Sequence, residues 1–282
     1  MLVRDLIVPR QTFSKKGDNG IVLVIGGNRI YHGAPILASM AALRSGANLV
    51  YTAVPRSNII AVRSFSPNII ALPLPDDKLT VRSANRLISM LPKKADTAAI
   101  GMGMSIPKPE ALVALIRQLK NDGTKLLLDA SALIPIILKE ISGTNTIITP
   151  HAGEYKRIFA AENISITEKE QISDIQRLAK QYGITIILKG WFNLVSDSNN
   201  EQVAVIKRTT PAMTVGGTGD VLSGLVAGLL TKSKPFDASI LGVYFNGVAA
   251  SLAYKRVGLH MVATDLIEDL PKVMKPFDII KE

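Results

Sequence analysis

Short apolar runs alternate with segments of helical periodicity along most of the chain. The first run, IVLVI at 21–25, is rich in β-branched residues and is followed by two glycines, which is typical of a buried strand. Similar runs predict strands at 48–54, 69–72, 97–100, 125–128, 146–148 and 185–188, and a hairpin formed by 193–196 and 202–207. Apolar residues at helical spacing predict helices at 35–45, 81–90, 109–121, 153–160, 168–182, 219–230, 237–256 and 264–270. This alternation predicts an α/β fold, a doubly wound, mostly parallel central sheet with helices on both faces.

No internal repeat and no linker divides the sequence. We therefore expect one domain over residues 1–282, beginning with a polar leader segment at 1–14. In an open parallel sheet, ligands bind at the edge where the strands end. The residues that directly follow the predicted strands are therefore the candidates for chemistry.

Five predicted strands are followed by unusual residues. After 21–25 comes GGNRIYHGAP, in which Gly33 and Ala34 precede a predicted helix opened by Pro35. Small residues at a helix start let a ligand approach the backbone closely. The other strand ends contribute Gly101 and Gly103 alternating with methionines, Asp129, His151 with Glu154, and Lys189 next to Gly190. Each has a plain explanation as a turn, a helix cap, core filling or a lysine reaching solvent, but their convergence on one edge favours a shared site.

The strongest candidate is the stretch TVGGTGDVLSGLVAGLL at 214–230. Its glycines can turn the backbone through positive φ, and the helix that follows offers unpaired N–H groups and a positive dipole end. Such a junction binds anions, typically phosphate. Helix capping alone would explain Asp220, but a carboxylate beside a bound phosphate also suits a proton acceptor.

These residue types suit phosphoryl transfer to a hydroxyl group. Asp220 would accept the hydroxyl proton, and the backbone N–H groups of Gly217, Thr218 and Gly219 would hold the transferring phosphoryl group. Magnesium bridging the nucleotide phosphates would stabilise the charge further. The sequence has no Walker A motif and no HRD or DFG motif, which excludes a P-loop enzyme and a protein kinase.

The amino-acid composition excludes several other classes of protein and of functional site. The chain has no cysteine, so disulfides, thiolate metal sites and a cysteine nucleophile are excluded, and its three histidines are not spaced as zinc ligands. The net charge of +10 suits polyanionic substrates or nucleic acid, but the basic residues are dispersed and form no RNA-binding motif. No uninterrupted apolar run approaches the roughly 20 residues that span a bilayer, and the N-terminus lacks a signal-peptide pattern. We expect a cytoplasmic protein that binds neither nucleic acid nor membrane.

The motifs resemble, in their order, those of one family. They are KKGDNGIVLVIGGN, YHGAP, AALRSGANLV, AIGMGMS, LLLDASAL, TPHAGE, LKG and GGTGDVLSGLVAGLL. The chain is similar in this respect to the ADP- or ATP-dependent NAD(P)H-hydrate dehydratases, which have the ribokinase-like fold, over roughly residues 15–271. The resemblance implies a repair reaction: the hydroxyl group of hydrated NADH or NADPH is phosphorylated, and elimination of phosphate restores the coenzyme and leaves AMP or ADP. Because hydroxide leaves poorly and phosphate leaves well, a kinase-like site can serve a lyase.

The resemblance also implies roles for individual residues. Asp220 matches the general base. The nucleotide would be bound by Gly217, Thr218, Gly219 and the loop formed by Lys189, Gly190, Trp191, Phe192 and Asn193. The hydrated coenzyme would contact Ala34, Gly103, His151 and Asp220. Glu154 would help to place Mg²⁺ through water, and the assembly would be a homotetramer, as is common among relatives.

The sequence departs from the family pattern in three places. GMGMS at 101–105 stands where GPGLG is usual, DASAL at 129–133 where DADAL is usual, and TTPAMTV at 209–215 where GNPGMAT is frequent. The first change removes a proline and a glycine beside Gly103, and the second puts Ser131 in place of an acid. Many relatives also carry a fused N-terminal epimerase domain, for which this chain has no room, so we expect a separate epimerase to act upstream.

Two other functions stay open at this stage. A ribokinase-like small-molecule kinase, for instance one acting on a vitamin-precursor alcohol, would share Asp220 and the glycine turn but would release a stable phosphate ester. A nucleotide-binding regulatory or nucleic-acid-associated protein would suit the charge of +10, although the intact Asp220 argues against it.

Overall fold

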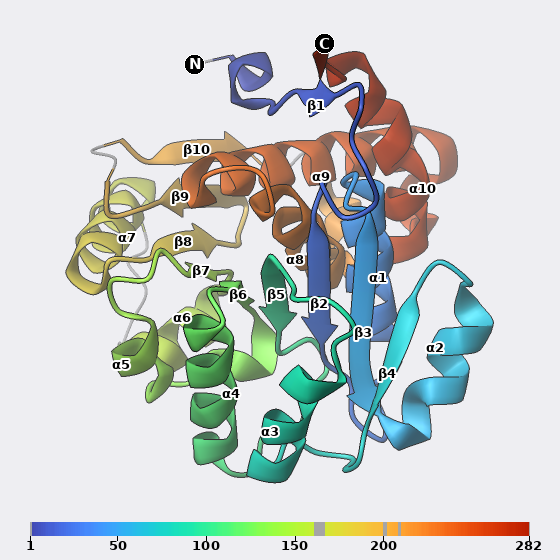
Figure 1. The fold of residues 1–282 in the computed structure, drawn as a ribbon. Helices are drawn as coiled ribbons and strands as arrows, with labels where there is room; N and C mark the ends of the chain where they lie inside the picture. Colours follow the sequence, from blue (N-terminus) through green and yellow to red (C-terminus); the bar gives the residue numbers. More distant parts are fainter. Residues whose placement is uncertain (1, 161–166, 200–201, 208–209, 282) are drawn as a thin grey trace.

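The computed structural model describes residues 2–160, 167–199, 202–207 and 210–281. Its centre is a nine-stranded sheet in the order β10-β9-β8-β7-β6-β5-β2-β3-β4 (Figure 1). The parallel strands are β2 (Ile21–Ile25), β3 (Leu49–Pro55), β4 (Ile70–Leu74), β5 (Thr97–Ile100), β6 (Lys125–Leu128), β7 (Ile147–Ile148) and β8 (Thr185–Leu188). The predicted hairpin forms the antiparallel edge, β9 (Phe192–Ser196) with β10 (Ala204–Lys207); residues 200 and 201 between them lie outside the described residues. The predicted α/β class with a mostly parallel sheet is confirmed.

Helices cover both faces of this sheet. They are α1 (Gly33–Arg44), α2 (Ile59–Phe65), α3 (Val81–Met90), α4 (Pro109–Asn121), α5 (Ile137–Ile141), α6 (Ala152–Phe159), α7 (Glu168–Tyr182), α8 (Thr218–Leu230), α9 (Pro235–Val257) and α10 (Ala263–Met274). Alternate residues of β2 show the two layers, because side chains along a strand point to opposite faces. Leu23 and Ile25 belong to a buried cluster that also contains residues of α3, α4 and α7, whereas Val22 and Val24 belong to one that contains residues of α1, α8 and α9.

The glycines of α8 let this helix pack unusually close to α1. A Cβ added at Gly224 would overlap the backbone of Ala38, and one at Gly228 would overlap the side chain of Ser45. Most residues of α8 are buried, from Val221 to Leu230. The small residues seen in the sequence therefore fix the position of α8, and with it the position of the glycine turn that precedes it.

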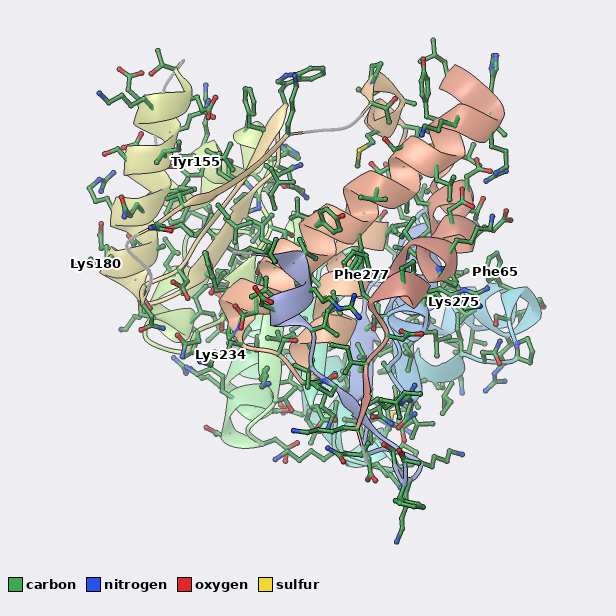
Figure 2. All side chains as sticks on the ribbon, turned by 90° about the horizontal axis from the view of Figure 1, so that it is seen from above. Phe65, Tyr155, Lys180, Lys234, Lys275 and Phe277 are labelled. Carbon is green, nitrogen blue, oxygen red and sulfur yellow. The ribbon has the colours of Figure 1, made fainter. Side chains whose placement is uncertain are left out.

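The leader segment is part of the folded structure. Arg10 and Gln11 form β1, which pairs in parallel with β11 (Ile280–Lys281), so that both ends of the chain lie together (Figure 1). Before β1, the short helix η1 (Val3–Leu6) packs against the layer of α8, α9 and α10. Phe277, labelled in Figure 2, completes this layer with its ring centroid 5.2 Å from that of Phe245.

Several details differ from the predicted elements. Helix α1 begins at Gly33 and not at Pro35, so Gly33 and Ala34 form its first turn. The sequence analysis missed the helices α2 and α5, which have 7 and 5 residues and are too short for a periodic pattern. It ended the last helix at Leu270, but α10 continues through Pro271 to Met274. The proline carbonyl still accepts a hydrogen bond from the Lys275 N–H, so the helix closes normally after it.

One helix in the described part of the chain, 235–260, is long and apolar enough to cross a membrane. Its most apolar window is 67% buried inside the structure. Packed against α8 and α10, it has the surroundings of a core helix in a folded domain.

Candidate active site

Polar side chains from three neighbouring strands meet at the carboxyl edge of the sheet. Asp129 follows β6, His151 follows β7, and Lys189 follows β8. A backbone bridge aligns two of them, because the Lys189 N–H donates to the Pro150 carbonyl at 2.8 Å and His151 pairs with Lys189. The convergence that the sequence indicated is therefore present in the structure.

Asp129 is the buried anchor of this group. Its side chain is almost fully enclosed, and its Oδ1 accepts hydrogen bonds from Lys189 Nζ and from the Ala130 N–H, both at 2.8 Å. Its Oδ2 accepts a hydrogen bond of 2.7 Å from Ser223 Oγ, which comes from α8. Burial alone would raise the pKa of Asp129, but the Lys189 ammonium and these hydrogen bonds outweigh burial and lower it. Asp129 therefore carries a fixed negative charge.

The Lys189 ammonium lies close to the first turn of α8. Its Nζ is 2.8 Å from Asp129 Oδ1 and 3.7 Å from Glu154 Oε2, and a Cβ added at Gly219 would lie 3.6 Å from the same Nζ. Burial opposes its charge, but the neighbouring carboxylates outweigh burial and raise the pKa of Lys189. The side chain therefore holds a positive charge where a bound anion would contact α8.

The glycine turn before α8 has the geometry that the sequence predicted. Gly217 has φ of +93°, and a Cβ there would lie 2.6 Å from Leu37 Cδ1, so another residue would be both strained and crowded. The first bond of the helix runs from the Val221 N–H to the Gly217 carbonyl, so the earlier N–H groups of the turn have no partner within the helix and can bind a ligand. Thr218 Oγ1 donates to the carbonyls of Met213 and Val215, so this hydroxyl holds the turn in place.

Asp220 stands in the first turn of α8, partly buried. Burial and the negative charges of Asp129 and Glu154 raise the pKa of Asp220 to about 7, against the opposing effect of Lys189. A general base works best when its pKa is near the working pH. The surroundings of Asp220 thus suit proton transfer at neutral pH.

His151 and Glu154 cap helix α6. The Glu154 Oε2 accepts a hydrogen bond of 2.8 Å from the His151 N–H, and His151 Nδ1 accepts from the Gly153 N–H at 2.9 Å. No group of three metal-ligating side chains occurs among the residues that the structure describes. Glu154 is therefore suited to hold a magnesium ion only together with nucleotide phosphates and water, which is the usual way proteins bind this metal.

Ala34, in the first turn of α1, lies next to Gly103, which follows β5. A Cβ added at Gly103, where φ is +63°, would lie 3.3 Å from the Ala34 Cβ. Both methionines of GMGMS are buried in the core, so they do not form a surface for a flat ring. Gly101 has φ of +121° and packs against the carbonyl of Asp129. The loop that carries Gly103 is therefore in contact with the buried Asp129. The departure from GPGLG therefore leaves the glycine turns intact.

A cavity of about 210 Å³ opens beside the turn. Its wall includes His151, Lys189, Gly190, Asn193, Thr218 and Gly219, together with Met213, Leu222, Val243 and Asn246. Of the predicted nucleotide loop, Trp191 and Phe192 do not belong to this wall; Trp191 is exposed with Lys207 Nζ 6.0 Å from its ring centroid, and Phe192 packs on the core.

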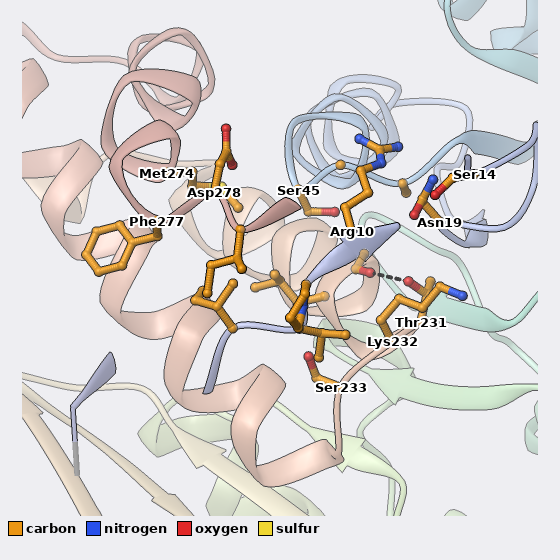
Figure 3. Close-up of a pocket in the computed structure, with 18 of the residues that line it drawn as sticks. Arg10, Ser14, Asn19, Ser45, Thr231, Lys232, Ser233, Met274, Phe277 and Asp278 are labelled. Atoms are coloured by element: carbon orange, nitrogen blue, oxygen red, sulfur yellow. Dashed lines mark hydrogen bonds between the residues drawn. The ribbon is translucent and has the colours of Figure 1, made fainter. Parts of the chain in front are cut away.

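A larger cavity, of about 680 Å³, lies at the other end of α8 between the leader segment and α9 and α10 (Figure 3). Its wall includes Arg10, Ser45, Thr231 and Phe277 and none of the predicted site residues. A helix of the length of α8 spans roughly 20 Å. The smaller cavity, next to the charged groups, is therefore the candidate active site.

The sequence analysis missed two residues of this site. Ser223 lies three positions after Asp220, so both are on one face of α8, and this spacing was the available signal. Asn246 is an amide in the otherwise apolar middle of α9. The sequence analysis left two roles open for Asp129, a helix cap and a residue of the site. The structure shows both, because Asp129 caps the short helix η3 (Ala130–Ala132) and binds Lys189.

Comparison with known proteins shows close relatives. A family described as NAD(P)H-hydrate dehydratase matches residues 22–272. The chain is 49% identical over 280 residues to an ADP-dependent (S)-NAD(P)H-hydrate dehydratase of Nitrosopumilus maritimus, covering 99% of this chain and 96% of that one. Among solved structures, it resembles an ADP/ATP-dependent NAD(P)H-hydrate dehydratase from Bacillus subtilis co-crystallised with ATP and Mg²⁺, with a TM-score of 0.83, 26% identity and coverage of 98% and 96%. A ribokinase-like superfamily protein from Enterococcus faecalis, with a TM-score of 0.79, 24% identity and coverage of 98% and 94%, shows the shared fold.

Proposed function

The chain belongs to the NAD(P)H-hydrate dehydratase family, and on this premise we propose that it is a lyase that dehydrates the hydrate of NADH or NADPH at the expense of ADP or ATP. ADP is the proposed co-substrate because the relative from Nitrosopumilus maritimus, 49% identical, is ADP-dependent. The kinase alternative is not favoured, because the matching family and this relative are both dehydratases.

One observation carries the mechanism: Asp220 lies in the first turn of α8, and the Lys189 ammonium lies close to the same turn. The hydroxyl oxygen of the hydrate attacks the terminal phosphorus of the nucleotide, and Asp220 takes the hydroxyl proton. An O–P bond forms, and the bond from that phosphorus to the shortened nucleotide breaks. The C–O bond of the phosphate ester then breaks with its electron pair leaving on phosphate, and loss of a proton from the adjacent ring carbon restores the double bond.

The backbone and Lys189 supply the electrostatic part of this reaction. The N–H groups of Thr218 and Gly219 would hold the phosphoryl group as it gathers charge, together with the ammonium of Lys189, which lies 3.6 Å from a Cβ added at Gly219. Mg²⁺ would neutralise nucleotide charge when bound, held by the phosphates and through water by Glu154. The Bacillus subtilis relative crystallised with ATP and Mg²⁺ supports this metal.

The remaining assignments extend the same proposal. Ala34, Gly103 and His151 would contact the hydrated coenzyme, and Lys189, Gly190 and Asn193 with the α8 turn would bind the nucleotide. We further propose a cytoplasmic homotetramer that works with a separate epimerase.

A single assay tests the function. Purified protein is mixed with hydrated NADH, ADP and Mg²⁺, and the recovery of dihydronicotinamide absorbance is followed together with phosphate release. A dehydratase restores the absorbance and releases one phosphate per coenzyme, whereas a kinase forms a stable ester without restored absorbance. No recovery with either ADP or ATP would sink the proposal.

Two variants test the role of Asp220. Asp220→Asn is expected to bind ADP but to lose at least about 100-fold in kcat, the usual contribution of a general base. Asp237→Asn, which changes a partly buried carboxylate at the start of α9, is the matched control and should keep wild-type turnover. Near-normal turnover of Asp220→Asn would remove it from the general-base role.

A further inference from the structure

A buried hydroxyl group joins helix α8 to the strand ends of the site. Ser223 lies in the second turn of α8, is 0% exposed, and makes a hydrogen bond of 2.7 Å from its Oγ to Asp129 Oδ2. Because an ionised carboxylate only accepts hydrogen bonds, the serine hydroxyl is the donor. The Oγ1 of Thr149, which follows β7, lies 3.5 Å from the same serine oxygen and can donate to it. The hydroxyl of Ser223 therefore connects α8 to residues that follow two strands of the sheet.

The Asp129 carboxylate links the two halves of the anion-binding site. Its Oδ1 accepts a hydrogen bond of 2.8 Å from Lys189 Nζ, and its Oδ2 accepts the bond from Ser223. Gly219 lies four residues before Ser223 and thus on the same side of α8. A Cβ added at Gly219 would lie 3.6 Å from Lys189 Nζ. Since a carboxylate is planar and rigid, the bond from Ser223 helps to set the distance between the N–H groups that begin α8 and the ammonium of Lys189.

We propose that Ser223 is a positioning residue for the terminal phosphate of the nucleotide, because through Asp129 it holds Lys189 and the first turn of α8 at the separation that binds this phosphate from both sides. The inference rests on the proposed function only in placing the terminal phosphate at α8. Ser223 is fully enclosed, so it acts through Asp129 and not on the ligand. Donors that are already in place stabilise charge best, because they need no reorganisation when the charge arrives.

A comparison of ADP with AMP isolates this effect, because the two nucleotides differ only in the terminal phosphate. The ratio of their dissociation constants measures what that phosphate gains from the α8 turn and Lys189. A general loss of stability weakens both nucleotides and keeps the ratio, whereas a loss of positioning at α8 weakens ADP alone. A hydrogen bond to a charged group changes an equilibrium constant by about tenfold or more. Loss of the Ser223 bond should therefore change the ratio measurably.

Dissociation constants are measured by titration calorimetry with Mg²⁺ and without hydrated coenzyme, so the result does not depend on turnover. The wild type should bind ADP more tightly than AMP. Ser223→Ala, which removes only the hydroxyl group, should lower this preference by at least about fivefold, chiefly by weakening ADP. Ser239→Ala is the matched control and should keep the wild-type ratio. Ser239 is also 0% exposed and donates a hydrogen bond of 2.7 Å, but its acceptor is the Pro235 carbonyl of its own helix, α9.

Each result decides the proposal. Equal affinity of the wild type for ADP and AMP overturns it, as does an unchanged ratio in Ser223→Ala or an equal fall in Ser239→Ala. If Ser223→Ala does not fold, Ser223→Cys replaces it, because a thiol is a weaker donor than a hydroxyl group. The ratio should again fall, and an unchanged ratio overturns the proposal. A fall of the ratio in Ser223→Ala without recovery of NADH by the wild type would leave this inference standing and refute the proposed function.

Discussion

Asp129→Asn would remove one negative charge from the centre of the site and keep the size of the side chain. Asp129 Oδ1 lies 2.8 Å from Lys189 Nζ, and the aspartate is 2% exposed. Two unit charges at this distance attract by about 6 kcal/mol at an effective dielectric constant of about 20. After the cost of desolvation, removal of one partner from a buried pair costs about 3–5 kcal/mol. At roughly 2–4 °C per kcal/mol, Tm should fall by about 6–20 °C.

Thermal unfolding followed by circular dichroism over a range of pH checks this value. The pKa of Asp129 is lowered in the folded state, so its stabilisation is present above the unfolded value near 3.9 and is lost as the pH falls. The pKa of Lys189 is raised, so its stabilisation is present below about 10.4 and is lost as the pH rises further. The difference in Tm should therefore be largest between about pH 5 and pH 10.

Glu140→Gln is the matched control for this prediction. It makes the same chemical change in an ion pair of nearly the same length, 2.7 Å, in which the Arg117 side chain is 61% exposed and the Glu140 side chain is 11% exposed. Solvent around the Arg117 guanidinium screens this pair more than the buried one, so the variant should lower Tm less than Asp129→Asn does. Equal losses of Tm in the two variants would refute the reasoning, because burial would then not decide the contribution of the pair.

Two further predictions concern the base and the helix that carries it. Because Asp220 must be deprotonated to accept a proton and has a pKa of about 7, kcat/KM should fall about tenfold per pH unit below pH 7; a flat profile from pH 5 to pH 8 would contradict its role. Gly224→Ala should destabilise the protein by about 1–3 kcal/mol in urea unfolding, because its Cβ would overlap the α1 backbone. Gly33→Ala, whose Cβ would meet nothing within 4 Å, should not show this loss.

The sequence predicted best those elements whose ends carry their own signals. Helix α7 begins at a capping box on Thr167 and ends at Gly183 in the left-handed conformation, and its predicted bounds match the structure. Helix α4 begins with Pro109 at its first position, which also fixed its start. Strands β1 and β11 have two residues each and pair across nearly the whole chain, so no local pattern could reveal them.

The residues of the candidate site also differ in whether the sequence alone could reveal them. Asp220, Lys189 and the glycine turn could be found because their residue types are unusual directly after apolar strands or before an apolar helix. Ser223 and Asn246 were harder to find, since each is a polar residue among apolar ones in a buried stretch of helix, and only the spacing of Ser223 from Asp220 gave a signal. What matters about them is the group they face, Asp129 for Ser223 and the cavity for Asn246, and only tertiary packing decides that.

The charges of the site explain why a chain with a net charge of +10 would still need a cation to bind its nucleotide. Asp129, Glu154 and Asp220 surround the single ammonium of Lys189, so with all four groups ionised the local charge is −2, from one positive and three negative charges. Lys189 is paired with Asp129 at 2.8 Å, so part of its charge is compensated before a phosphate binds. Long-range attraction by the net positive charge can bring a polyanion to the site, but close to α8 the N–H groups and Lys189 face three carboxylates, and an added cation would offset the remaining negative charge. The same excess of negative charge, together with burial, holds the pKa of Asp220 at about 7. The arrangement that would suit Asp220 to accept a proton is therefore also the one from which we expect nucleotide binding to depend on Mg²⁺.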